Sequence, residues 1–106
     1  MLERLATINV GQLRRIQWQI PVAKLCPETG APETGSFITI SYAAHEKSLE
    51  LNALRAYIHA LAAERAFDVE EFVQQIQRDC QTVLSVPVQV GATFVLRDGI
   101  TLTVET

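Results

Sequence analysis

Apolar and polar side chains alternate in the first well-patterned part of the chain. Four apolar residues fall on every second position and alternate with Arg15, Gln17 and Gln19: Ile16, Trp18, Ile20 and Val22. A period of two predicts a half-buried strand. A second such run places Ile38, Ile40 and Tyr42 on one face and Thr39 and Ser41 on the other. Residues 26–35 between them contain two Pro and two Gly and are predicted to form a loop. The first dozen residues show no clear period and predict an irregular or edge segment.

The period then changes to that of a helix. Leu51, Leu54, Ile58 and Leu61 recur at three- and four-residue spacing, which predicts a helix that ends near Phe67. Ser48 is the predicted N-cap of this helix. Asp68, followed three residues later by Glu71, predicts the start of a second helix through a variant of the capping box. The apolar stripe of the second helix comprises Val69, Phe72, Val73, Ile76, Cys80, Val83 and Leu84.

Two further strands complete the pattern. Pro87 follows the second helix, and the next strand has Val88, Val90, Ala92 and Phe94 in alternation with Gln89 and Thr93. Asp98-Gly99 predicts a tight turn into a last strand that carries Ile100, Leu102 and Val104. The order of elements is therefore ββααββ, in one domain that spans residues 1–106. Such an order predicts an α+β fold, with one antiparallel sheet and both helices on the same face.

The other face of this sheet is rich in uncharged polar residues: Gln17, Gln19, Thr39, Ser41, Gln89, Thr93, Thr101 and Thr103. One interpretation is an ordinary half-exposed sheet, which is the commoner case among antiparallel sheets. The other is the inner wall of an oligomeric barrel, in which neighbouring subunits join their sheet edges and so remove the exposed edge strands. The low number of Lys and Glu residues on this face favours the second interpretation.

Composition narrows the classes of function. The net charge of -3 provides no basic footprint for a nucleic acid, so direct nucleic-acid binding is not expected. We find no secretion signal and no apolar run as long as a membrane span, which leads us to expect a cytoplasmic protein. Cys26 and Cys80 lie far apart and outside any CxxC or Cys/His pattern. His45 and His59 have no partners at metal-ligand spacing, so no metal is assigned, and His59 is expected on a helix surface.

Three local stretches carry a resemblance to a known family. Residues 25–33 read Leu-Cys-Pro-Glu-Thr-Gly-Ala-Pro-Glu and lead into a strand that ends at Ser41 and Tyr42. Residues 50–57 read Glu-Leu-Asn-Ala-Leu-Arg-Ala-Tyr, and residues 94–100 read Phe-Val-Leu-Arg-Asp-Gly-Ile. Together they resemble the NADPH-dependent 7-cyano-7-deazaguanine reductase (QueF) family, whose members have the tunnelling fold (T-fold). The resemblance implies a ring-like homo-oligomer, and the Cys-Pro-x-Thr-Gly element is its most specific part.

The resemblance implies two catalytic residues. Cys26 is similar to the family nucleophile, which attacks the nitrile carbon of the substrate and forms a covalent thioimide. A thiolate on a polar, partly exposed loop suits that chemistry. Glu33 stands seven residues later, where the family has an aspartate that delivers a proton, and it keeps the carboxylate but adds a methylene. One extra residue also separates Glu33 from the next strand. Cys80 is expected to serve only packing.

The resemblance also implies binding residues. Glu50 and Glu70 are similar to two glutamates that hold the deazapurine, although acidic residues are also common at helix N-termini for electrostatic reasons. Arg55 and Arg97 are similar to cations that would meet the phosphates of NADPH. No glycine-rich dinucleotide motif or P-loop is present.

Four residues depart from the family pattern: Ala31, Glu33, Asn52 and Val69. They leave two alternatives to a reductase. One is an amidinotransferase that adds ammonia to a nitrile already installed in transfer RNA, as in archaeosine formation. The other is a subunit without catalysis that binds a purine or a pterin, or only assembles.

Overall fold

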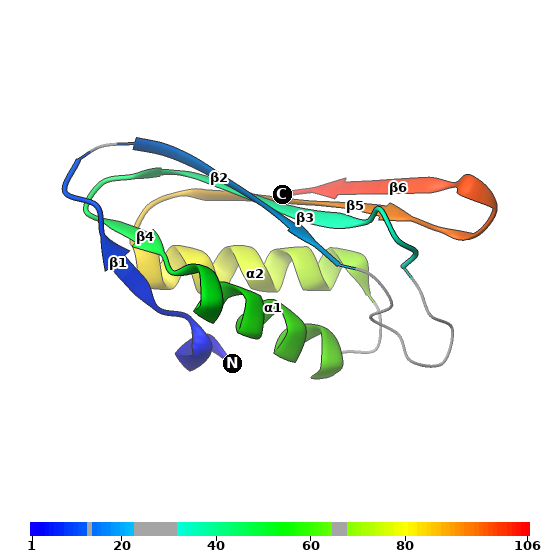
Figure 1. Ribbon diagram of the computed structural model, residues 1–106, viewed down its shortest axis with the longest axis horizontal. Helices are drawn as coiled ribbons and strands as arrows, with labels where there is room; N and C mark the ends of the chain where they lie inside the picture. The colour runs from blue at the N-terminus through cyan, green and yellow to red at the C-terminus, as the bar shows by residue number, and fades with distance from the viewer. Residues whose placement is uncertain (13, 23–31, 65–67) are drawn as a thin grey trace.

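The computed structural model describes residues 1–12, 14–22, 32–64 and 68–106 of the chain (Figure 1). In chain order its elements are η1 (Leu2–Arg4), β1 (Thr7–Asn9), β2 (Arg14–Pro21), β3 (Phe37–Ala44), β4 (Lys47–Leu49), α1 (Leu51–Glu64), α2 (Val69–Leu84), β5 (Val88–Val95), η2 (Arg97–Gly99) and β6 (Thr101–Glu105). The four predicted strands correspond to β2, β3, β5 and β6, and the two predicted helices to α1 and α2.

The main sheet has four antiparallel strands in the order β2-β3-β5-β6. The central strands β3 and β5 place Ile40 opposite Val90, and β2 places Trp18 opposite Ile40. Because α1 and α2 connect β3 to β5, the two hairpins β2–β3 and β5–β6 meet side by side along these central strands. The mixed α+β architecture expected from the sequence is confirmed.

A second, smaller sheet was missed, so the prediction of a single sheet was wrong. Strand β1, from the first dozen residues, pairs antiparallel with β4, and Thr7 lies opposite Leu49. Each strand has three residues, which is too short to show a period of two. Their pairing forms only because the chain turns back after β3, so no local pattern in the sequence predicts it.

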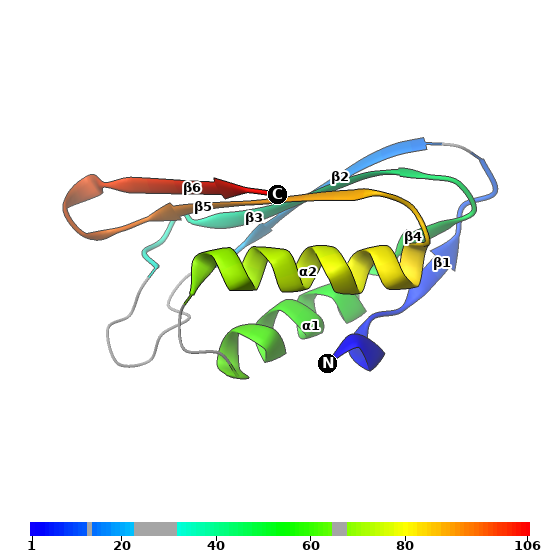
Figure 2. The same ribbon diagram turned by 180° about the vertical axis from the view of Figure 1, so that it is seen from behind.

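The hydrophobic core lies between the main sheet and the two helices, which cover the same sheet face (Figures 1 and 2). Ile38 and Ile40 of β3 are 0% exposed, as are Leu54 and Ile58 of α1. Five of the seven residues in the stripe predicted for α2 are buried, and the other two, Val69 and Val83, are half-buried. The alternation along β2, β3 and β5 therefore assigned the core face correctly. In the last strand it did not, because Ile100 and Leu102 are 61% and 38% exposed.

The helix starts were predicted with mixed success. The Asp68 carboxylate accepts a hydrogen bond from the Glu71 backbone N–H at 3.1 Å, which confirms the predicted cap of α2. The prediction that Ser48 caps α1 was wrong, because Ser48 lies in β4 and is buried. Glu50 performs that function instead. The predicted end of α1 at Phe67 lies outside the described residues.

Tyr42 joins three strands through its hydroxyl. The Trp18 indole N–H of β2 and the Leu49 backbone N–H of β4 both donate to it, at 2.9 and 3.0 Å, and the Ser48 hydroxyl lies 2.9 Å away. Trp18 and Tyr42 are diagonal neighbours across the β2–β3 pair, where large side chains reach each other. This network fixes β4, and with it the start of α1, against the main sheet.

Candidate active site

The loop of the β2–β3 hairpin contains both residues predicted to be catalytic. Cys26 lies outside the described residues, so its predicted role as nucleophile stays a prediction. The base of the loop is described. The Val22 backbone N–H donates to the Ser36 carbonyl oxygen at 2.9 Å, directly after the last paired residues of the two strands, Pro21 and Phe37.

Glu33 is held by its backbone, while its side chain is exposed. Its N–H donates to the Val95 carbonyl oxygen at 2.9 Å, and its own carbonyl oxygen accepts from the Ser36 hydroxyl at 2.7 Å. These bonds fasten the end of the loop to the end of β5, two residues before Arg97. The segment before β3 accordingly runs beside the β5–β6 hairpin (Figure 1). The carboxylate faces solvent, where a bound molecule could reach it.

Relative to the family pattern, one extra residue lies between Glu33 and β3, and a tight turn accommodates it. The Ser36 backbone N–H donates to the Glu33 carbonyl oxygen at 3.3 Å, which closes a β-turn over residues 33–36. Gly35, at the third position, has a φ of 101°, which glycine adopts without steric cost. The turn lets Glu33 remain bonded to β5 although the segment is longer than in the family pattern.

Glu50 lies at the N-terminus of α1, and its carboxylate caps the helix. One oxygen accepts from the Asn52 N–H at 3.0 Å and the other from the Ala53 N–H at 2.7 Å. These two hydrogen bonds, that of Asn52 first, lower the pKa of Glu50 below its ordinary value. A carboxylate has about four lone-pair positions, so two accepted bonds leave capacity for a ligand. The capping role is therefore structural, and a binding role stays a prediction.

Glu50→Gln should reduce stability at neutral pH and have little effect in acid. The pKa of Glu50 is lower in the folded chain than in the unfolded one, so its charged form stabilises the fold above the unfolded pKa. That contribution disappears as the pH falls through the lowered pKa. Thermal unfolding midpoints at pH 7 and pH 3 measure the effect, with exposed Glu46→Gln as the control. A deficit of equal size at both pH values would contradict an ionised cap.

Glu70 borders a cavity of about 510 Å³ between α2 and the end of β6. Gln74 and Arg78 line it from α2, and residues 104–106 line it from the sheet edge. As predicted, Glu70 lies in the first turn of α2. Its exposed carboxylate, together with amide and guanidinium groups, gives this cavity the hydrogen-bonding groups that a polar heterocycle needs.

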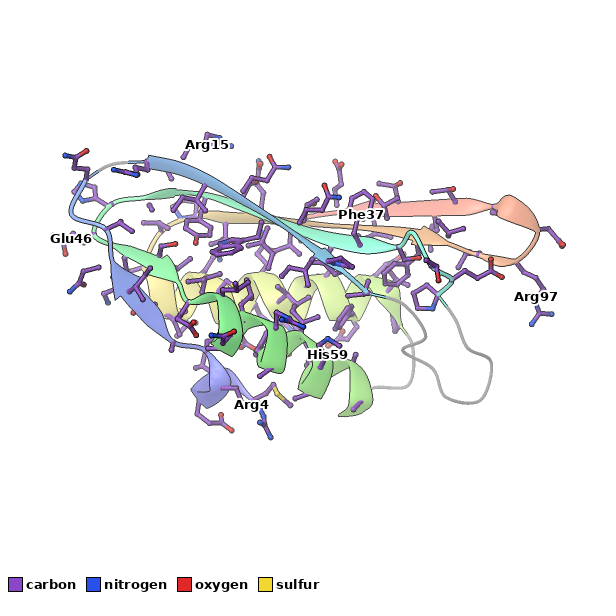
Figure 3. The ribbon with its side chains drawn as sticks, in the orientation of Figure 1. Arg4, Arg15, Phe37, Glu46, His59 and Arg97 are labelled. Atoms are coloured by element: carbon purple, nitrogen blue, oxygen red, sulfur yellow. The ribbon has the colours of Figure 1, made fainter. Side chains whose placement is uncertain are left out.

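The structure separates the predicted binding residues into two groups. Glu50 and Arg55 belong to the first half of α1, beside β4, whereas the start of α2 and the β5–β6 hairpin lie toward the opposite end (Figures 1 and 2). Arg97 is at the tip of that hairpin, where Figure 3 shows it pointing away from the body of the protein. Glu33, Glu70 and Arg97 thus lie toward one end, and the fold of a single chain does not bring Glu50 beside Glu70.

Cys80 has the packing role predicted for it. It is 0% exposed, and its burial, with the nearby Asp79 charge as a smaller cause, raises the pKa of its thiol to about 12. The thiol therefore stays protonated and is no competitor to Cys26 as a nucleophile. His59 is exposed on α1, as expected. Within the described ranges no three His, Cys, Asp or Glu residues cluster as metal ligands, and no described helix is long and apolar enough to cross a membrane.

Sequence reasoning missed Ser36. It is 2% exposed and bonds to Glu33, Val22 and Val95, so it connects both ends of the loop to β5. A serine just before a strand is common, and only the pairing of distant segments distinguishes this one.

Comparisons with known proteins agree with the resemblance in the motifs. The family model described as QueF-like protein matches residues 33–106. The chain is 38% identical over 106 residues to the NADPH-dependent 7-cyano-7-deazaguanine reductase of Magnetococcus marinus, which covers 98% of this chain and 81% of that protein. It is 36% identical over 81 residues to the protein of the same name from Nitrosospira multiformis, covering 76% of this chain and 57% of that protein.

Proposed function

The chain belongs to the family of QueF-like proteins, and we propose that it reduces the nitrile of 7-cyano-7-deazaguanine to an aminomethyl group, with NADPH, in queuosine biosynthesis. The observation that carries this proposal is the 38% identity over 98% of the chain to a reductase of that name. The alignment includes nearly every element of the fold, so the likeness is not confined to one motif.

The chemistry starts at Cys26. Its thiolate attacks the nitrile carbon, forming a carbon–sulfur bond while the carbon–nitrogen triple bond becomes a double bond. The nitrogen then needs a proton, which Glu33 delivers from the same loop. NADPH, when bound, would supply the two hydrides that the four-electron reduction of a nitrile to an amine requires. The carbon–sulfur bond breaks between these two transfers and returns the thiolate to Cys26. The exposed side chain and fastened backbone of Glu33 support this assignment.

Glu50 and Glu70 hold the deazapurine in this proposal, with contributions from two copies of the chain. Each carboxylate accepts hydrogen bonds from the ring N–H groups, but the two lie toward opposite ends of one protomer (Figures 1 and 2). A ring of protomers joined at their sheet edges would bring the first half of α1 of one copy to the α2 start of the next. In support, β2 and β6 are the outer strands of the main sheet, and Ile100 and Leu102 near β6 are 61% and 38% exposed.

Arg55 and Arg97 are the residues proposed to hold the NADPH phosphates. Both are exposed, and neither forms an ion pair with any other described residue. A guanidinium offers paired N–H donors that match phosphate oxygens, so these two side chains fit the group. They belong to opposite ends of the protomer, as the glutamates do, and would meet one cofactor between neighbouring copies.

An assay with two alternative second substrates tests the proposed function. Purified protein is incubated with 7-cyano-7-deazaguanine and either NADPH or ammonia, and the products are identified by mass spectrometry. We expect the aminomethyl product only with NADPH, and two NADPH consumed for each. An amidine formed with ammonia would contradict the reductase and favour the amidinotransferase. No product under either condition would favour a binding or assembly role. Sedimentation of the same sample as a single chain would contradict the ring.

A further inference from the structure

We propose that Ser36 is a positioning residue that holds the Glu33 backbone against β5, so that the Glu33 carboxyl group is placed to deliver a proton during the attack on the nitrile. This inference rests on the proposed function, because it concerns the geometry of the same reaction. Ser36 touches neither substrate nor cofactor in this proposal. It acts through Glu33 and Val22, the described residues that it bonds on either side of the β2–β3 connection.

The hydroxyl of Ser36 acts as both a hydrogen-bond donor and a hydrogen-bond acceptor. It donates to the Glu33 carbonyl oxygen at 2.7 Å and accepts from the Val95 backbone N–H at 2.8 Å. One side chain thereby joins the end of the loop to the end of β5. Residues 36 and 95 are far apart in the sequence, so this link is tertiary and does not belong to a local turn.

The backbone of Ser36 fixes the other end of the loop. Its carbonyl oxygen accepts from the Val22 N–H, and its N–H donates to Glu33. The two points at which the chain enters and leaves the loop are therefore bonded to one buried residue. A separate bond, from the Glu33 N–H to the Val95 carbonyl oxygen, completes the attachment to β5.

An alanine at this position would leave a buried donor without its partner. The Val95 N–H would lose the Ser36 hydroxyl, and Ser36 is too buried for water to take its place without local rearrangement. The Glu33 carbonyl would keep only the longer bond from the residue 36 N–H. The end of the loop would then be free to shift relative to β5. Misplacement by about 1 Å can cost roughly 100-fold in rate.

The test compares Ser36→Ala with Ser48→Ala. Both remove a buried serine hydroxyl, but Ser48 bonds to Tyr42 and the Leu49 carbonyl, away from the loop. Two quantities are measured at saturating 7-cyano-7-deazaguanine without cofactor: the rate of covalent adduct formation, by intact-protein mass spectrometry, and hydrogen exchange at residues 22, 33 and 95. Ser36→Ala should slow adduct formation by about 10- to 100-fold, with faster exchange at these amides and unchanged substrate affinity. Ser48→Ala should leave exchange at these amides unchanged. Because Ser48 lies beside the start of α1, where Glu50 is, any effect of this variant should fall on substrate affinity and not on the adduct rate at saturating substrate.

Each outcome decides the inference. Equal adduct rates in the two variants, at equal loss of stability, would overturn it. If Ser36→Ala does not fold, Ser36→Thr retains the hydroxyl, and a rate as low as one tenth of the parent in that folded variant would also overturn it. A parent protein that forms no adduct would refute the proposed function. In that case unchanged exchange at residues 22 and 33 in the alanine variant would refute the anchoring as well, whereas faster exchange would support the anchoring alone.

Discussion

Replacing Cys26 with alanine is expected to abolish the covalent adduct with 7-cyano-7-deazaguanine completely. Alanine has no nucleophile, and the only other thiol of the chain, Cys80, is buried with its pKa raised to about 12. Intact-protein mass spectrometry under denaturing conditions, without NADPH, measures the result. The parent should gain the mass of one substrate, and Cys26→Ala should gain none, because only a carbon–sulfur bond survives denaturation.

The matched control is Cys80→Ala, which removes a thiol from α2 and should retain the adduct. Some loss of stability is expected there, because Cys80 packs in the core. An adduct that persists in Cys26→Ala would place the nucleophile elsewhere. An adduct absent from the parent at every pH between 6 and 9 would exclude the thioimide route for this chain.

Glu33→Gln is expected to slow adduct formation by roughly 100-fold or more while leaving substrate affinity unchanged. A glutamine amide has the same shape but carries no carboxyl proton for the nitrogen of the former nitrile, and a positioned general acid contributes about 10²- to 10⁴-fold. The structure gives a reason to expect that this substitution changes only the carboxyl group and leaves the loop in place. The backbone of Glu33 is hydrogen-bonded to Val95 and Ser36, so the exposed side chain can change without moving the loop.

Two further variants sharpen this result. Glu33→Asp restores the side chain of the family pattern and should keep most of the rate, because it retains a carboxyl group. Glu46→Gln, at an exposed glutamate in the turn between β3 and β4, should behave as the parent does. The rate is measured at saturating substrate, which separates the chemical step from binding. A Glu33→Gln variant as fast as the parent would remove this residue from the mechanism.

The local parts of the fold could be predicted because they depend on short-range physics. Alternation along β2, β3 and β5 assigned the buried face, and the stripe of α2 identified the side of the helix that packs on the sheet. Asp98 and Gly99 were predicted as a turn and have φ values of 63° and 75°, as a tight hairpin requires. Each of these features is decided by neighbours a few residues away.

The candidate site was predictable only as a set of residues. The motifs around Cys26, Glu50 and Arg97 led to the family, and the matches to QueF-like proteins confirmed it. The roles of the individual residues remain predictions. What no motif could show is that Glu50 and Glu70 lie toward opposite ends of the folded chain, since that depends on the antiparallel packing of α1 and α2 (Figure 1).

The sequence by itself determined the main strands, the two helices, the family and the buried faces of β2, β3, β5 and α2, because periodicity and short motifs are local properties. Only the tertiary structure decided three other features. Strand β1 pairs with β4, Glu50 rather than Ser48 caps α1, and Ser36 bonds to Val22, Glu33 and Val95 and so connects the base of the β2–β3 loop to β5. The first and the third depend on hydrogen bonds between residues that are distant in the chain. The second depends on which of two nearby side chains reaches the free N–H groups at the start of α1. Their pairing is settled only when the sheet and helices pack together.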